Sequence, residues 1–162
     1  MQAAHFDVSA ELAALSAGRT DIGGVGCFVG TVRAERQGRA GQQGPALQTL
    51  VLEHYAGMTE AAMAAIAAEA AQRWDLLGCT LVHRVGALRP GEPIVLVLAA
   101  SRHRQAALEA TAFLIDWLKT KAPFWKRETF ADGSVVWVDA RETDDAAAQR
   151  WGAPTSPRHD RA

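Results

Sequence analysis

Apolar residues recur at intervals of three and four over residues 104–121, which is the spacing of one face of an α-helix. The stripe consists of Ala107, Leu108, Thr111, Leu114, Ile115 and Leu118. Glu109, Asp116 and Lys119 lie off this stripe. Pro123 predicts the end of the helix, because the residue before a proline avoids helical geometry.

Two further helices are predicted from their capping residues. An alanine-rich helix has Thr59 as its cap and runs to about Trp74. Within it Glu69 and Arg73 stand four residues apart, a spacing typical of a solvated ion pair. A shorter helix lies within residues 7–18, with Ser9 as its N-cap.

Runs rich in valine and other apolar residues predict strands at about 24–33, 47–55, 79–85, 94–100, 125–130 and 134–138. LRPGEP at 88–93 predicts a chain reversal, and ADG at 131–133 predicts a hairpin turn. The polar segment 34–46 is predicted to be a loop, either a lid or plain disorder. Because strands and helices do not alternate regularly, we expect an α+β fold with a largely antiparallel or mixed sheet and two main helices.

The composition is that of an ordinary soluble globular domain, with 49% hydrophobic and 22% charged residues among 162. One domain is predicted over residues 1–151, followed by a flexible tail at 152–162 that has little to bury. The formal charge of −1 argues against a general nucleic-acid binder. The longest apolar run, 94–100, is too short for a membrane span, and a cytoplasmic location is predicted.

Metal and thiol chemistry find little support in the sequence. Cys27 and Cys79 lie in apolar surroundings without CxxC spacing, so we expect two buried free thiols. His54 and His83 stand in predicted strands, and HExxH motifs and ligand-spaced carboxylates are absent. These histidines are interpreted as hydrogen-bonded strand residues, and neither a metal site nor a cofactor is predicted.

All the lysines of the chain lie within LKTKAPFWKRE at residues 118–128. Of the 17 Lys and Arg residues, Lys119, Lys121 and Lys126 are the three lysines, which leaves fourteen arginines. An amine can release its proton or attack a carbonyl, whereas a guanidinium stays charged. A structural explanation remains an alternative, because cations also stabilise the C-terminal end of a helix.

Three cationic segments interrupt an otherwise neutral chain. They are Arg33, Arg36 and Arg39; Arg102, His103 and Arg104; and the lysine stretch. Each lies at a predicted strand or helix boundary, where side chains can converge without disturbing a core. The residues after Ser101 open a helix, and its free N–H groups suit a phosphate or a carboxylate. The pattern indicates a divided anion pocket, with scattered surface charge as the alternative.

Five short motifs, in this order and spacing, carry a resemblance to a known family. They are FVGTVR (28–33), LEHYAGMTE (52–60), HRVG (83–86), SRHR (101–104) and LKTKAPFWKRE (118–128). The chain resembles the large, catalytic subunit of molybdopterin synthase from about residue 24 to residue 151. The last motif is the most specific of the five.

The resemblance implies a sulfur transferase of molybdenum cofactor biosynthesis. This family converts cyclic pyranopterin monophosphate to molybdopterin by installing the two sulfurs of the dithiolene. The sulfur arrives as a thiocarboxylate on the C-terminal glycine of a small ubiquitin-like subunit, whose tail enters the large subunit. Two large subunits form a central homodimer within a heterotetramer, and their α+β fold has a hammerhead-like β arrangement.

Matching the family's motifs residue by residue implies roles in one pocket. Lys119 would polarise the thiocarboxylate or take part in acyl transfer, and Lys126 would assist substrate placement and proton transfer. Arg33, His103 and Arg104 would hold the phosphate and the pterin. The same pocket would be lined by Thr31, Val32, Arg127, Glu128 and Phe28. Lys121 is assigned charge only, because the family accepts arginine at that position.

Two other functional classes remain as alternatives. The first is a binding module whose aromatic and basic stretch docks an acidic or nucleic-acid partner without chemistry, and the near-neutral net charge counts against it. The second is a stand-alone phosphate-ester enzyme, which predicts activity without a protein partner. The contacts of the 34–46 loop stay open, because Ala34, Glu35 and Arg36 depart from the family's pattern.

Overall fold

The computed structural model describes residues 1–34, 44–138 and 150–152, and within these ranges helices and antiparallel strands form an α+β fold, as predicted. The helices are α1 Val8–Ser16, α2 Met58–Trp74 and α3 Arg104–Lys121. The strands are β1 Gly24–Thr31, β2 Leu47–His54, β3 Gly78–His83, β4 Gly86–Leu88, β5 Pro93–Ser101, β6 Phe124–Phe130 and β7 Val135–Val138. The short strand β4 was not predicted; it lies between the strand expected at 79–85 and the reversal expected at 88–93.

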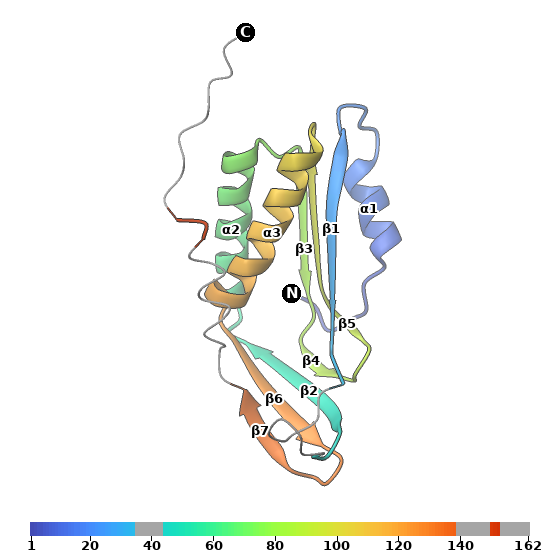
Figure 1. The fold of residues 1–162 in the computed structure, drawn as a ribbon, viewed down its shortest axis with the longest axis vertical. Coiled ribbons are helices and arrows are strands. Elements are labelled where there is room, and N and C mark those ends of the chain that lie inside the picture. Colours follow the sequence, from blue (N-terminus) through green and yellow to red (C-terminus); the bar gives the residue numbers. More distant parts are fainter. Residues whose placement is uncertain (35–43, 139–149, 153–162) are drawn as a thin grey trace.

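The strands form two sheets. The first has the order β1-β5-β3 and the second the order β4-β2-β6-β7. Helices α2 and α3 cover one face of the first sheet, α1 lies on the other face, and the second sheet lies at one end of this layered part (Figure 1). The central strand β5 is buried at every position from 95 to 101, which explains its uninterrupted apolar sequence.

Both faces of the first sheet and one face of the second carry a group of buried side chains. On the helical face of the first sheet, Val95, Val97 and Ala99 pack against Phe113, Leu114 and Leu118. On the α1 face, Leu96 and Leu98 pack with Phe6 and Val82. The second sheet buries Leu47, Leu50, Leu52, Leu88 and Phe130 together with Val32. Val32 follows β1 directly, so the end of β1 is fixed against the second sheet.

Helix α3 has the predicted bounds, but the predicted apolar stripe was wrong at one position. Leu108 is 62% exposed, whereas Ala110 and Phe113 are completely buried. The buried stripe follows positions 107, 110, 111, 113, 114 and 118, and it turns away from Leu108. Thr111 fits the buried stripe because its hydroxyl donates to the Ala107 carbonyl at 2.8 Å.

Both predicted helix caps were wrong. In α1 the cap is Asp7, whose carboxylate accepts hydrogen bonds from the backbone N–H groups of Ser9 and Ala10 at 2.8 and 3.1 Å. In α2 the cap is Gly57, and Thr59 lies inside the helix. The Thr59 hydroxyl instead donates to the Pro123 carbonyl at 3.1 Å. This bond ties the start of α2 to the chain just after α3.

Two side-chain predictions also need correction. Cys27 is exposed and Cys79 only half-buried, and burial raises the pKa of the Cys79 thiol to about 11. The Arg73–Glu69 ion pair forms at 2.6 Å, but Arg73 is largely covered and its guanidinium lies 5.0 Å from the centre of the Phe113 ring. This pair is therefore part of the packing of α2 on α3 rather than a solvated pair.

Two predictions fall largely outside the described residues. They are the 34–46 loop, of which 35–43 are not described, and the tail, of which 153–162 are not described. Trp151 packs against Trp74 and Phe113, and its indole N–H donates to Asp116 at 2.8 Å. In the described part of the chain, no helix is both long and apolar enough to cross a lipid bilayer.

The approach of β1 to α3 gives a first testable prediction. A Cβ atom on Gly26 would lie 2.2 Å from the Thr111 hydroxyl and 2.5 Å from the Ala107 carbonyl oxygen. Because one of these neighbours is backbone, Gly26→Ala is expected to destabilise the fold by about 2–3 kcal/mol in urea unfolding. On Gly24, two residues earlier, a Cβ would meet nothing closer than 3.6 Å. Equal midpoints for Gly26→Ala and the control Gly24→Ala would contradict the close approach.

Candidate active site

The two candidate lysines lie on either side of the junction between α3 and β6. Lys119 is in the last turn of α3, and Lys126 is the third residue of β6. The connection is only Ala122–Pro123, and its carbonyl at Pro123 is held by Thr59. Both lysines therefore occupy the end of the helical layer that adjoins the second sheet (Figure 1).

Strand alternation separates the charged residues of β6. Lys126 pairs with Leu52 and Val138, and it shares a face with Glu128, because side chains two residues apart in a strand point the same way. Arg127 points to the opposite face, where its guanidinium lies 5.9 Å from the centre of the Trp137 ring. The structure thus brings Lys126 and Glu128 together and places Arg127 away from them.

The segment after β1 is held at the same end. The Val32 N–H donates to the Glu92 carbonyl at 2.9 Å, and the Val32 carbonyl accepts from the Gly91 N–H at 2.7 Å. Val32 is also buried with Leu52, the strand partner of Lys126. Thr31, Val32 and Arg33 therefore lie near the face of the second sheet that carries Lys126.

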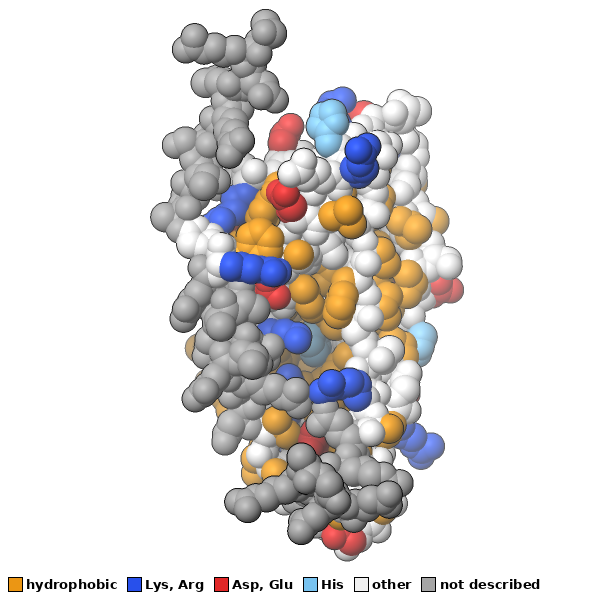
Figure 2. Space-filling view, in the orientation of Figure 1, with side chains coloured by type: hydrophobic (Ala, Val, Ile, Leu, Met, Phe, Trp, Pro, Cys, Tyr) orange, Lys and Arg blue, Asp and Glu red, His pale blue; other side chains and the backbone are white. Residues whose placement is uncertain are grey.

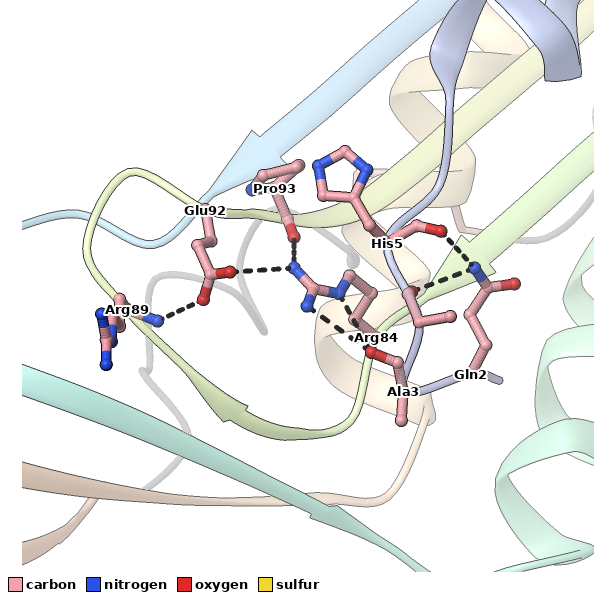
Figure 3. Close-up of polar contacts among 8 residues, drawn as sticks. Gln2, Ala3, His5, Arg84, Arg89, Glu92 and Pro93 are labelled. Carbon is pink, nitrogen blue, oxygen red and sulfur yellow. Dashed lines mark hydrogen bonds and ion pairs between the residues drawn. The ribbon is translucent and has the colours of Figure 1, made fainter.

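A buried arginine supports the turn that holds Val32. Arg84 is 7% exposed, and its guanidinium donates to the carbonyls of Pro93 at 3.0 Å and of Ala3 at 3.4 and 3.5 Å (Figure 3). The Glu92 carboxylate lies 3.8 Å from the same guanidinium and accepts from the Arg89 N–H at 2.6 Å. Arg84 thus links the N-terminal segment to the turn at 89–93.

His83, the residue before Arg84, lies against the start of β6. Its ring stacks on Phe124 with 4.2 Å between the ring centres and 24° between the planes. Nδ1 donates to the Arg84 carbonyl at 2.9 Å, because a carbonyl oxygen can only accept. The pKa of His83 is lowered to about 4, chiefly by burial and also by the positive charge of Lys126. The hydrogen bond to the Arg84 carbonyl raises this pKa, but by less than burial lowers it. His83 is therefore neutral at physiological pH.

His103 and Arg104 lie at the other end of α3. His103 caps the helix, Arg104 is its first residue, and both are exposed. Lys119 comes fifteen residues after Arg104, which is about 22 Å along the helix axis. Phe28 lies between the two ends, on the helical side of β1 beside Val97. Within one chain, His103 and Arg104 therefore lie at the opposite end of α3 from Lys119 and Lys126.

The remaining strand histidine is also hydrogen-bonded, as predicted for both. His54 Nε2 lies 3.1 Å from the Glu60 carboxylate, whose other oxygen accepts from the Gly57 N–H at 2.7 Å. A hydrogen bond from its own backbone N–H, followed by the bonds from Gly57 and His54, holds the pKa of Glu60 below its usual value. Among the described residues, no group of three or more His, Cys, Asp or Glu side chains is arranged to hold a metal ion.

A family model described as MoaE protein matches residues 1–121. The chain belongs to the MoaE protein family. It is 57% identical over 152 residues to the molybdopterin synthase catalytic subunit of Mesorhizobium japonicum, which covers 93% of this chain and 91% of that one. Identity to the Pseudomonas aeruginosa protein of the same name is 53% over 151 residues, 93% of this chain and 96% of that one.

A solved structure, the molybdopterin biosynthesis MoaE protein from Burkholderia ambifaria, matches with a TM-score of 0.76 at 49% identity. The match covers 94% of this chain and 95% of that one. The family resemblance found in five motifs is therefore confirmed over most of the chain.

In this MoaE-family chain, sequence reasoning missed the contact between His83 and the start of β6. HRVG is one of the motifs that carry the family resemblance, but the sequence predicts its histidine only as a hydrogen-bonded strand residue. The only sequence signal was the position of His83 at the end of a strand. Its partner Phe124 lies 41 residues further along the chain and in another sheet, which no local pattern indicates.

Proposed function

We propose that the chain is the catalytic subunit of a molybdopterin synthase. It converts cyclic pyranopterin monophosphate to molybdopterin, with the C-terminal thiocarboxylate of a small ubiquitin-like subunit as the sulfur donor. The observation that carries the proposal is the position of two lysines. In a chain that aligns over 93% of its length with such catalytic subunits, Lys119 and Lys126 lie on either side of the junction between α3 and β6. The proposal includes a cytoplasmic location, since these relatives are named as subunits of a biosynthetic enzyme.

The chemistry needs positive charge and a transferable proton at the same place. The cyclic phosphate and the thiocarboxylate are both anions, and cationic side chains offset their mutual repulsion. Lys119 donates hydrogen bonds to the thiocarboxylate oxygen while negative charge develops there. Lys126 transfers protons at the pterin, and Glu128 on the same face of β6 orients its ammonium group. Arg33, beside the buried Val32, contributes charge for the phosphate.

A complete pocket requires two copies of the chain. His103 and Arg104 lie about 22 Å from Lys119 within one copy, too far to hold the same substrate. The edge strand β1 exposes Phe28 and Val29, and hydrophobic side chains gather over α3 and β1 in Figure 2. If two copies pair through the surface formed by β1 and α3, this exposed apolar surface is covered. This pairing also lets each copy supply His103 and Arg104 to the lysines of the other.

The proposed function is tested by reconstitution from purified components. The chain is mixed with cyclic pyranopterin monophosphate and a small subunit that carries either a thiocarboxylate or an ordinary carboxylate. Molybdopterin, measured by mass spectrometry, is expected only with the thiocarboxylate form. Product without any small subunit would favour the stand-alone enzyme. A stable complex that forms no product would favour the binding module.

A further inference from the structure

The first residue of the HRVG motif, His83, makes a contact between the two sheets. His83 is the last residue of β3 in the first sheet, and Phe124 is the first residue of β6 in the second. Their rings stack at 4.2 Å, and Phe124 also packs against the buried side chains of both sheets. The contact therefore lies where the chain passes from α3 into β6.

The backbone around His83 fixes the orientation of its ring. Nδ1 donates to the Arg84 carbonyl at 2.9 Å, and the His83 carbonyl accepts from the Gln2 N–H at 3.1 Å. In β3, His83 also pairs with Val95 of the central strand β5. The side chain of Arg84 is itself held by the carbonyls of Ala3 and Pro93 (Figure 3). The ring thus stands on rigid elements, a requirement for holding another side chain in place.

The charges around His83 favour a neutral ring. Three groups lower the pKa of His83 through their positive charge. They are Lys126 on β6, the amino group of Met1 and, when protonated, His54 on β2. The Glu60 carboxylate lies 3.1 Å from His54 Nε2. A positively charged group in place of His83 would repel Lys126, whereas a neutral aromatic ring supports Phe124 without this repulsion.

We propose that His83 is a positioning residue for Lys126. Its ring supports Phe124, and Phe124 fixes the start of β6, from which Lys126 projects on the same face two residues later. The inference rests on the proposed function only in that Lys126 takes part in the reaction. A role in packing alone would stabilise the fold without affecting the Lys126 side chain in particular.

The small number of lysines makes a direct test possible. Protein labelled with ¹³C at lysine Cε should give signals from three side chains, which single Lys→Arg variants assign. The measurement uses the full chain in complex with unlabelled small subunit. His83→Ala is expected to shift or broaden the Lys126 signal and to leave the Lys119 signal unchanged. His83→Phe keeps a ring against Phe124 and is expected to leave both signals unchanged.

Turnover provides the second readout. His83→Ala should lower kcat by about 10- to 100-fold, the range expected when a reacting group is displaced by up to about 1 Å. KM should stay within about twofold, because binding groups are not removed. His83→Phe should restore kcat to within about threefold of the unaltered chain. The matched control is His5→Ala, which removes an exposed histidine from a different aromatic contact and should change neither readout.

A second variant keeps the test decisive if His83→Ala does not fold. Phe124→Leu removes the other ring and should move the same lysine signal, and in the double variant the two effects should not add. An unchanged Lys126 signal in a folded His83→Ala or Phe124→Leu variant would overturn the inference, as would equal shifts of all lysines. A shifted Lys126 signal with normal turnover would support the positioning role and overturn the proposed role of Lys126.

Discussion

Lys119→Arg is expected to lower molybdopterin formation by about 100-fold or more while the complex with the small subunit still forms. Arginine keeps the positive charge at the end of α3, but it does not release its proton and its planar fork replaces a compact ammonium. Lys119 is exposed, so the exchange leaves the packing of α3 unchanged. Single-turnover product formation and the dissociation constant of the complex are the two measurements.

The matched control for this variant is Lys121→Arg, two residues further along the lysine stretch. It makes the same chemical exchange at a position that is assigned charge only, so product formation should stay within about twofold of normal. If Lys119→Arg retained near-normal product formation, the amine would have no chemical role. The lysine stretch would then serve as a charged docking surface.

A mixture of two inactive variants is expected to recover activity if each pocket is shared between two copies. Lys119→Ala and Arg104→Ala should each retain about one hundredth of normal activity or less. When their subunits are mixed and reassociate at random, half of the dimers are mixed, and each mixed dimer has one intact pocket. About a quarter of normal activity should therefore return.

The control for this recovery pairs two variants from the same half of the pocket. Lys119→Ala mixed with Lys126→Ala leaves a defect in every pocket, so activity should remain near that of the single variants. Recovery in neither mixture would mean that His103 and Arg104 act outside the pocket or that copies do not share it. Equal recovery in both mixtures would show that Lys119 and Lys126 of one pocket come from different copies, which would contradict the proposed arrangement.

The sequence was sufficient for elements whose determinants are local. The bounds of α3 were predictable because Pro123 ends a regular apolar repeat, and the β6–β7 hairpin because Gly133 supplies the positive φ that its turn needs. The caps of α1 and α2 were missed because capping depends on the backbone angles of one residue. In each helix the predicted hydroxyl residue, Ser9 or Thr59, stands two positions after the true cap.

Part of the layout of the site follows from the sequence alone. Alternation along a strand already predicts that Lys126 and Arg127 face opposite ways, and the length of α3 already separates Arg104 from Lys119. The stacking of His83 on Phe124 was not predictable in this way. It depends on how the two sheets meet, which is decided by packing between residues distant in the chain.

In the proposed dimer, the rigid rod of α3 belongs to two reaction centres at once. Its first turn serves one centre and its last turn serves the other, so its length is a dimension that both share. Adding or deleting one residue within it would turn one end against the other by about 100° and move it by about 1.5 Å. We therefore expect insertions and deletions to be tolerated in the connecting segments and not within α3.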